Sequence, residues 1–191
     1  MDGALFDIHL SLSEIEAGID RVLASPKDIG LLELIVRRPK VNGREVVEKA
    51  VLDVENGLIG DNWSARGSSR SDNGLGHPEM QLNLMNSRMA ELIAGSRERM
   101  KLAGDQLYVD LDLSRENLPV GTRLAIGSAV IEITAIPHLG CKKFSQRFGL
   151  EAMKFVNSEK GKYNNLRGIN AKVVVAGETV AGDQIHVLRK P

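Results

Sequence analysis

The sequence contains one cysteine among 191 residues, so the chain cannot form an internal disulfide bond. A lone cysteine fits a reducing compartment. The 25 lysines and arginines balance the 25 aspartates and glutamates, which leaves no global positive field to hold a nucleic-acid backbone. The composition therefore argues against a disulfide-stapled secreted domain and against a nucleic-acid-binding protein.

Long apolar runs are also absent. No stretch approaches the roughly 20 apolar residues that span a bilayer. Residues 1–10 lack the basic start and the apolar centre of a signal peptide. We therefore expect a cytoplasmic protein with no membrane partner. A chain of this length buries about 70% of its unfolded surface, which is enough for one domain with an appended segment.

The chain begins with a helical pattern. Ser11 with Glu14 and Ser13 with Glu16 form two overlapping capping boxes, and apolar residues then recur at helical spacing up to Leu23. We assign residues 1–29 to an N-terminal helical segment and residues 30–191 to the main domain. The helix is expected to cover a sheet, or alternatively to bind a partner.

The main domain is dominated by short strands with glycine-centred turns. This pattern predicts a mainly β (α+β) fold, a β-barrel with a few covering helices. No βαβ periodicity is evident. Gly-Asp pairs recur at unequal spacings and are interpreted as turns. The expected strands and turns include residues 31–36, the turn Asn42-Gly43, residues 80–85, residues 122–126 and residues 129–134 on either side of Gly127-Ser128, and residues 171–175.

Short helices are expected as well. Asn86-Ser87 caps one that Gly95 stops, and residues 144–156 show a helical pattern with a break at Gly149. In the turn at Gly60-Asp61, the Asp61 carboxylate is expected to accept backbone N–H groups.

Two polar stretches leave alternatives open. Residues 64–79 are rich in serine, glycine, asparagine and arginine, which predicts an exposed loop, either a lid or an insertion. The basic run at residues 37–40 is either functional or the solvated edge of a strand.

The single cysteine, Cys141, lies in surroundings that suit an anionic sulfur. Lys142 and Lys143 follow it, Gly140 precedes it, and His138 lies three residues before it. Cationic neighbours favour the reactive thiolate. Residues 138–172 contain eight lysines and arginines against two glutamates, a surplus of six that could hold an anionic ligand.

Other interpretations of this stretch stay open. A lone cysteine is commonly a small buried hydrophobic residue. His138 could polarise the thiol or a ligand, or could cap a strand end by hydrogen bonding. His138 and Cys141 could form half of a zinc site, but zinc takes three or four protein ligands, and no second cysteine or nearby histidine follows.

The order of the motifs resembles the MOSC family, named for the C-terminal domain of molybdenum cofactor sulfurases. The similarity spans roughly residues 30–188. It rests on Gly57-Leu58-Ile59-Gly60-Asp61, Gln81-Leu82, Glu116-Asn117-Leu118, Gly121-Thr122-Arg123-Leu124 with Ile126-Gly127, Cys141, Arg167-Gly168-Ile169 and Gly182-Asp183. The chain departs from the family where Gly140 precedes the cysteine in place of proline, and where Arg115 precedes Glu-Asn-Leu in place of glycine.

The resemblance implies a β-barrel domain whose cysteine either carries sulfur as a persulfide or ligates molybdenum in a bound pterin cofactor. Cys141 would be the catalytic residue and metal ligand, with His138 beside it. The residues expected to hold the molybdenum cofactor are Lys142, Lys143, Arg147, Arg167, Gly60, Asp61 and Asn117. The chain has no room for a pyridoxal phosphate domain, so sulfur would come from a separate cysteine desulfurase.

Three functions follow as hypotheses. In the first, the molybdenum site reduces N-hydroxylated small molecules and takes electrons from a separate donor. In the second, Cys141 is a persulfide carrier. In the third, the chain is a non-catalytic binding module that engages a partner through residues 64–79 and the first helix.

Overall fold

The backbone closes into a barrel. The computed structural model describes residues 9–68, 71 and 74–189. Within these residues seven strands form a closed ring in the order β11-β7-β8-β9-β5-β6-β1, and β1 pairs back to β11. The strands are β1 (Ile29–Arg37), β5 (Leu82–Asn86), β6 (Leu107–Asp110), β7 (Arg123–Ile126), β8 (Ala129–Ile133), β9 (Ile169–Val175) and β11 (Gln184–Leu188). The predicted fold class is confirmed.

Tight turns set the register of neighbouring strands. Gly127 has a φ of 58° in the two-residue turn that joins β7 to β8, and Ile126 pairs with Ala129 across it. Asn42, with a φ of 62°, lies in the turn that leads from β1 to β2 (Glu45–Val47), which extends the sheet beyond the barrel. The predicted Asn42-Gly43 and Gly127-Ser128 turns are therefore confirmed.

The barrel interior is an apolar core. Alternate residues of a strand point to opposite faces, so each strand sends every second side chain inward. On β7 and β8 these are Leu124, Ile126, Ala129, Ile131 and Ile133, and all are buried. A second, smaller sheet closes one flank of this core. It contains β3 (Lys49–Asp53), β4 (Gly57–Leu58) and β10 (Gly177–Val180) in the order β10-β3-β4.

One pair of barrel strands is parallel, which the sequence did not indicate. β5 runs parallel to β6, and Leu84 pairs with Leu107. The crossover between them contains α3 (Ser87–Ala94) and the 3-10 helix η2 (Arg97–Ala103). Parallel neighbours need such a connection. The expectation that the chain lacks βαβ units is therefore wrong at this one place. The helix itself is confirmed, with Asn86 as its N-cap and Gly95 as its left-handed C-cap.

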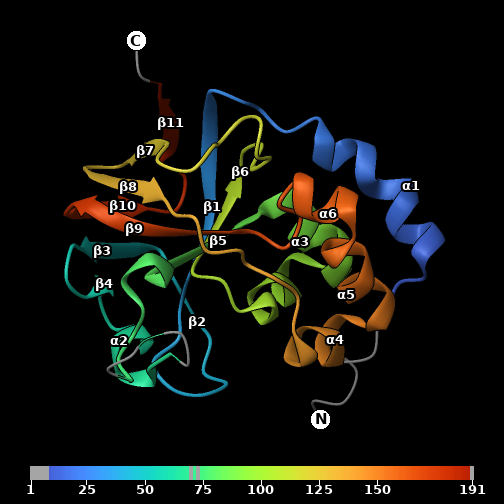
Figure 1. The fold of residues 1–191 in the computed structure, drawn as a ribbon, viewed down its shortest axis with the longest axis horizontal. Helices are drawn as coiled ribbons and strands as arrows, with labels where there is room; N and C mark the ends of the chain where they lie inside the picture. The colour runs from blue at the N-terminus through green and yellow to red at the C-terminus, as the bar shows by residue number, and fades with distance from the viewer. Residues whose placement is uncertain (1–8, 69–70, 72–73, 190–191) are drawn as a thin grey trace.

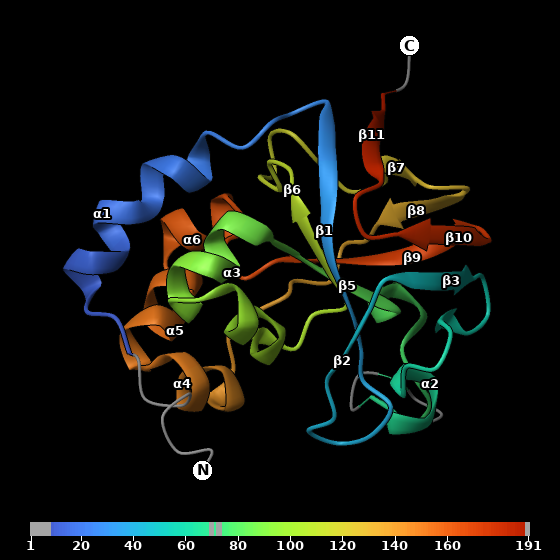
Figure 2. The ribbon, with the colours of Figure 1, turned by 180° about the vertical axis from the view of Figure 1, so that it is seen from behind.

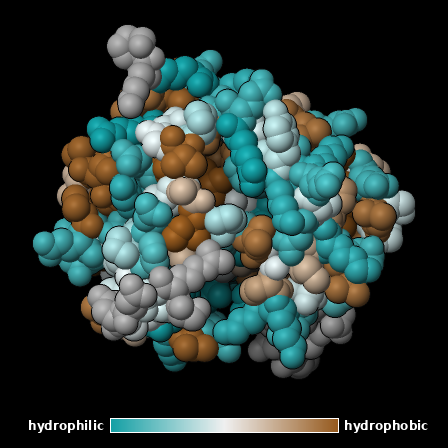
Figure 3. All heavy atoms as spheres, in the orientation of Figure 1, coloured by the Kyte–Doolittle hydropathy of each residue, from teal (hydrophilic) through white to brown (hydrophobic). Residues whose placement is uncertain are grey.

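Helices α1 and α3 to α6 gather on one side of the barrel, and the three-stranded sheet lies on the other (Figures 1 and 2). Their apolar faces form a second core against the outer surface of the barrel. Figure 3 shows hydrophilic residues over much of the molecular surface, with apolar patches among them. The second core includes Ile15, Ile19, Met89, Ile93, Phe144, Phe148, Phe155 and Val156, packed with Val36, Met85 and Tyr108 from the strands.

The segment between β8 and β9 forms three short helices. α4 (Lys142–Phe148) and α5 (Leu150–Asn157) meet at Gly149, and α6 (Glu159–Tyr163) follows. Gly149 has a φ of 91°, a conformation that favours glycine, so the helix breaks there as predicted. Phe144 and Phe148 lie on the buried face of α4, with ring centroids 5.1 Å apart.

The first helix, α1 (Leu12–Leu23), has one of the two predicted capping boxes. Ser11 accepts a hydrogen bond from the Glu14 backbone, and the Glu14 side chain accepts one from the Ser11 backbone. Its buried face, Ile15, Ile19 and Val22, packs in the second core against α3 and α5. The helix therefore covers other helices rather than a sheet.

The stretch of residues 64–79 is partly helical. It overlaps the short helix α2 (Trp63–Arg66) at one end and the 3-10 turn η1 (Pro78–Met80) at the other. Trp63 is buried, whereas residues 64–66 are exposed. Residues 69–70 and 72–73 lie outside the described residues, so the expected lid or insertion stays a prediction. In the described part of the chain, none of the helices has both the length and the apolar character needed to cross a bilayer.

Replacing Ile15 by alanine tests whether α1 is an integral part of the fold. Ile15 is fully buried in the second core, whereas Leu12 on the same helix is 42% exposed. We expect Ile15→Ala to lower the free energy of unfolding by about 2–5 kcal/mol, and Leu12→Ala by about 0.5 kcal/mol or less. Urea unfolding measures both. Equal effects of the two substitutions would contradict the packing of α1 described above.

Candidate functional site

A fully buried carboxylate, Asp105, lies at the centre of a cluster of buried polar side chains. It follows η2 and precedes β6. The Arg167 guanidinium contacts both of its oxygens, at 3.0 Å and 2.7 Å. The His138 ring nitrogen Nε2 lies 2.7 Å from its Oδ1. A buried charge is tolerated only when it is paired and hydrogen-bonded, and Asp105 meets both conditions.

Arg167 is held on several sides. Its second terminal nitrogen donates a hydrogen bond to the Ala103 carbonyl at 3.0 Å. Its guanidinium carbon lies 4.8 Å from the centroid of the Phe144 ring, within reach of a cation–π interaction. Gly168 follows with a φ of 113°, and an added Cβ there would collide with the Leu84 carbonyl. Glycine at 168 therefore lets the backbone approach β5 closely enough to deliver Arg167 to Asp105.

The protonation states in this cluster follow from its contacts. Burial alone would raise the pKa of Asp105, but the positive charge of Arg167 and the hydrogen bonds from His138 and Arg167 outweigh burial and hold that pKa below its usual range. Burial lowers the pKa of His138, the positive charge of Arg167 lowers it further, and Asp105 only partly opposes them. His138 is therefore neutral near pH 7. Because an ionised carboxylate only accepts hydrogen bonds, Nε2 carries the proton and Nδ1 is an acceptor.

A second buried ion pair joins Arg38 to Asp61. The side chains are 4% and 0% exposed, and the guanidinium contacts both carboxylate oxygens, at 2.8 Å and 2.9 Å. Asp61 also accepts hydrogen bonds from the backbone N–H groups of Arg38 and Trp63, each at 2.9 Å. The predicted backbone-accepting role of Asp61 is confirmed.

Polar contacts connect the two ion pairs. Arg38 donates to Asn83 Oδ1 at 2.8 Å and to the Gly104 carbonyl, next to Asp105, at 2.9 Å. Asn83 donates in turn to Asn170 Oδ1 at 2.6 Å. Asn170 donates to the Ile136 carbonyl at 2.9 Å, in the loop that continues to His138 and Cys141. The loop that presents the cysteine is therefore anchored to strands β5 and β9 of the barrel.

Cationic side chains from three parts of the chain meet at one small pocket, which we call the basic pocket. Arg38, Lys40 and Arg44 come from the β1–β2 connection, Arg66 from α2 and Lys143 from α4. Val41, Asn42 and Asn62 complete its lining, and none of the acidic residues that the structure describes contributes. Asp61, the acid behind Arg38, is already paired. The basic pocket therefore has a net positive charge within a chain that is neutral in sum.

The arginines of the basic pocket lie where their charge is unfavourable. Burial lowers the pKa of Arg44, and repulsion from Arg147 and Arg38 lowers it further. Burial and repulsion from Arg38 likewise lower the pKa of Arg66. Within the described part of the chain, Arg44 Nε and Asn62 Oδ1 are buried without a hydrogen-bond partner. An anion among these groups would relieve the repulsion and would accept from the unpaired donor.

Only some of the lysines and arginines that form the predicted cation surplus of residues 138–172 lie at or near the basic pocket. Lys143 lines the basic pocket, and Arg147 lies close to Arg44 while donating to the Leu102 carbonyl at 2.6 Å. Lys142 is exposed. Arg167, Lys154 and Lys172 are paired with Asp105, Glu151 and Glu132 respectively.

Cys141 is exposed and is the N-cap residue of α4. The alternative in which this cysteine is a buried hydrophobic residue is therefore wrong. Within the described residues, the ring of His138 hydrogen-bonds to Asp105 and not to the thiol. Among the described residues, no group of three or more histidine, cysteine, aspartate or glutamate side chains could hold a metal ion.

Two other predicted cofactor residues have structural contacts. Gly60 has a φ of 84° in the turn before Asp61, a conformation that favours glycine. Asn117 is buried, donates to the carbonyls of Lys27 and Asp112 at 2.9 Å and 2.8 Å, and accepts from Arg189 at 2.8 Å. Asn117 thus joins chain segments, and its role in cofactor binding stays a prediction.

The sequence interpretation missed several important residues. From the sequence, Gly104-Asp105 looked like the other Gly-Asp turns. Of these pairs, only Gly182-Asp183 has a carboxylate whose role is confined to a turn, where Asp183 accepts a hydrogen bond from the backbone N–H of Val180 at 2.8 Å. Arg44 follows the predicted Asn42-Gly43 turn, and Arg66 lies in the stretch of residues 64–79 that was interpreted as an exposed loop. The recurring Gly-Asp pair was the available signal, because Asp61 and Asp105 each neutralise a buried arginine.

Comparison with solved structures identifies the architecture. The YuaD protein from Bacillus subtilis matches with a TM-score of 0.60 and 16% identity, over 85% of this chain and 97% of YuaD. YiiM from Escherichia coli matches with a TM-score of 0.55 and 20% identity, over 84% of this chain and 71% of that YiiM chain. YiiM from Geobacillus stearothermophilus matches with a TM-score of 0.53 and 12% identity, over 86% of this chain and 75% of that YiiM chain. No family model and no curated protein matches the sequence. The shared architecture fits a MOSC-like fold.

The neutral state of His138 predicts how stability depends on pH. The unfolded chain binds a proton at His138 near pH 6.5, whereas the folded chain binds it only at lower pH. Falling pH therefore favours the unfolded chain, and the free energy of unfolding should decrease below about pH 6.5, by at most about 1.4 kcal/mol per pH unit from this residue. Urea unfolding between pH 8 and pH 5 measures the slope. An equally steep slope in His138→Gln would assign the effect to other groups.

Proposed function

We propose that the protein binds a phosphate-bearing small molecule in the basic pocket, and that this ligand is the molybdenum cofactor. The observation that carries the proposal is the meeting of Arg38, Lys40, Arg44, Arg66 and Lys143 at one pocket without a lining acid. A cluster of like charges is unfavourable by itself, and a bound anion reverses that cost. Arginine and lysine are the side chains that proteins use for phosphate.

The residues present fit the pterin cofactor in two respects. The basic pocket would hold its phosphate, and Cys141 offers an exposed sulfur of the soft type that binds molybdenum. Cys141 precedes Lys143 by two residues, so their backbones are at most roughly 7 Å apart. The cofactor would supply a redox-active metal, whereas the protein would supply one thiolate, the phosphate contacts and the fixed loop. Lys142 would add positive charge beside the sulfur.

This arrangement supports reduction of small molecules, with N-hydroxylated compounds as the expected substrates and a separate protein as electron donor. The MOSC-like fold and the exposed thiol are the grounds for this assignment. In such a reaction the substrate loses its N-hydroxyl oxygen as water, taking up two electrons and two protons from the donor and solvent.

The exposure of Cys141 favours a second candidate, a sulfur carrier. A surface thiol is accessible to the persulfide of a partner desulfurase, and attack on its outer sulfur would leave a persulfide on Cys141 and a free thiol on the partner. Lys142 and Lys143 would favour the thiolate that this exchange requires. Both candidates use the same residue, and they differ in what the residue carries.

Arg44→Gln tests the anion site. In phosphate-free buffer we expect this variant to be at least as stable as the wild type, because the substitution removes repulsion. Pyrophosphate at about 100 times its dissociation constant should stabilise the wild type by about 2.7 kcal/mol, or several degrees in Tm, and the variant by much less. Thermal unfolding at constant ionic strength measures both. Arg123→Gln, on the far exposed edge of β7, is the matched control. An equal response of Arg44→Gln and the wild type would contradict the site.

Cys141→Ser tests the role of the sulfur. Protein from a host that makes molybdenum cofactor should contain about one molybdenum per chain, or one additional sulfur atom, and the serine variant should contain neither. Intact mass and metal analysis distinguish the two candidates. Wild-type protein that lacks both molybdenum and labile sulfur after exposure to the cofactor and to a desulfurase would contradict both candidates. The anion site would still be tested separately by the pyrophosphate experiment.

A further inference from the structure

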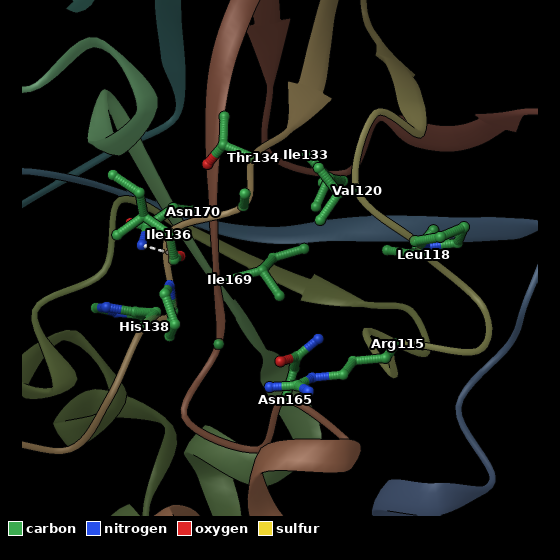
Figure 4. Close-up of a pocket in the computed structure, with 14 residues that line it drawn as sticks. Arg115, Leu118, Val120, Ile133, Thr134, Ile136, His138, Asn165, Ile169 and Asn170 are labelled. Atoms are coloured by element: carbon green, nitrogen blue, oxygen red, sulfur yellow. Dashed lines mark hydrogen bonds between the residues drawn. The ribbon is translucent and has the colours of Figure 1, made fainter.

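A larger pocket lies between the loop before β7, the end of β8 and the start of β9 (Figure 4). Its volume is about 380 Å³, within the range of small-molecule sites, which spans roughly 300–1,000 Å³. It shares no lining residue with the basic pocket. We call it the Arg115 pocket. Neither Cys141 nor any acidic residue lines it.

Polar groups lie at its two ends. Figure 4 shows Arg115 extending its guanidinium toward Asn165, with His138 on the opposite side and Ile169 between them. No described residue forms an ion pair or hydrogen bond with the Arg115 guanidinium, and none contacts His138 Nδ1. The exposed residue Arg115 therefore offers free donors, and the neutral His138 offers a free acceptor.

The other polar side chains of this pocket already donate hydrogen bonds within the protein. Thr134 donates to the Glu79 carbonyl at 2.6 Å, Asn165 donates to the Leu113 carbonyl at 2.8 Å, and Asn170 both donates and accepts within the buried network. The rest of the lining is largely apolar, contributed by Leu118, Val120, Ile133, Ile136 and Ile169. An apolar wall with a few free polar groups at defined positions is typical of a site for a small organic ligand.

We propose that the Arg115 pocket binds a small organic acid. Its carboxylate pairs with the Arg115 guanidinium, its compact apolar body lies against Ile169, and a hydroxyl or N–H group donates to His138 Nδ1. A single guanidinium matches one carboxylate through two parallel hydrogen bonds. The Arg115 pocket thus differs from the basic pocket, where five cations suit a more highly charged phosphate.

His138 is presented to the ligand in one orientation. Asp105 holds Nε2 at 2.7 Å, which fixes both the ring and its tautomer. The buried ion-pair cluster therefore positions His138, which accepts from the donor group of the ligand. The loop that contains Arg115 positions the guanidinium that pairs with the carboxylate of the ligand. This inference does not depend on molybdenum, on phosphate or on the reactivity of Cys141.

The test uses three probes that fit the three contacts. 4-Hydroxyphenylacetate has a carboxylate, an aromatic body and a hydroxyl donor, 4-hydroxyphenylacetamide lacks the charge, and phenylacetate lacks the donor. Amide chemical shifts followed by NMR titration give both the dissociation constant and the location. We expect the acid to shift the signals of residues 133–138 and 168–170, and to bind about ten- to hundredfold more tightly than the amide.

Variants of two exposed arginines complete the test. In Arg115→Gln, the affinity for 4-hydroxyphenylacetate should decrease to that for the amide, and the affinity for the amide should be unchanged. Arg123→Gln is the control, because Arg123 pairs with Glu132 on the barrel and does not line the pocket. Phenylacetate should bind more weakly than the hydroxylated acid to both the wild type and Arg115→Gln.

Several results would overturn the proposal. These are the absence of saturable shifts with the acid, equal binding of the acid and the amide, and an unchanged affinity in Arg115→Gln. Displacement of the acid by pyrophosphate would place it in the basic pocket and would also reject the assignment. Pyrophosphate binding that leaves the acid titration unchanged would support two separate sites.

Discussion

The buried carboxylate of Asp105 is the constraint around which the polar interior is arranged. An unpaired charge at this depth would cost several kcal/mol, so the structure must bring Arg167 and His138 to it. Arg167 comes from the approach to β9, and His138 comes from the loop after β8. Formation of the cluster therefore fixes the loop that ends at Cys141 and the start of α4. Phe144, stacked under Arg167, ties the helical layer to the same point.

The same network runs between the basic pocket and the Arg115 pocket, which differ in chemistry. Arg38 reaches from the basic pocket through Asn83 to Asn170, which lines the Arg115 pocket. The hydrogen bonds of such a buried polar network hold its members in one arrangement. The cations of the basic pocket and the acceptor of His138 are therefore positioned by one set of contacts, although they face different cavities and suit different anions.

Local patterns in the sequence were sufficient for much of the fold. The turns at Asn42 and Gly127, the cap at Asn86 and the break at Gly149 depend on neighbouring residues, and all four agree with the structure. The Asp105 cluster was out of reach, because its partners are 33 and 62 residues away along the chain. A Gly-Asp pair looks the same whether its carboxylate caps a turn, as in Asp183, or neutralises a buried arginine. The parallel pairing of β5 and β6 was missed because the crossover is a single short unit.

The anion binding that we propose depends on how charges are paired and not on how many there are. The chain has no net charge, yet Asp61 and Asp105 are each paired with a buried arginine. Glu132 and Glu151 pair with nearby cations. Arg44, Arg66 and Lys143 are left without a lining acid, and Arg115 is left without any ionic partner in the described residues. Because the cations of the basic pocket repel one another in the free protein, these positions gain from the binding of an anion.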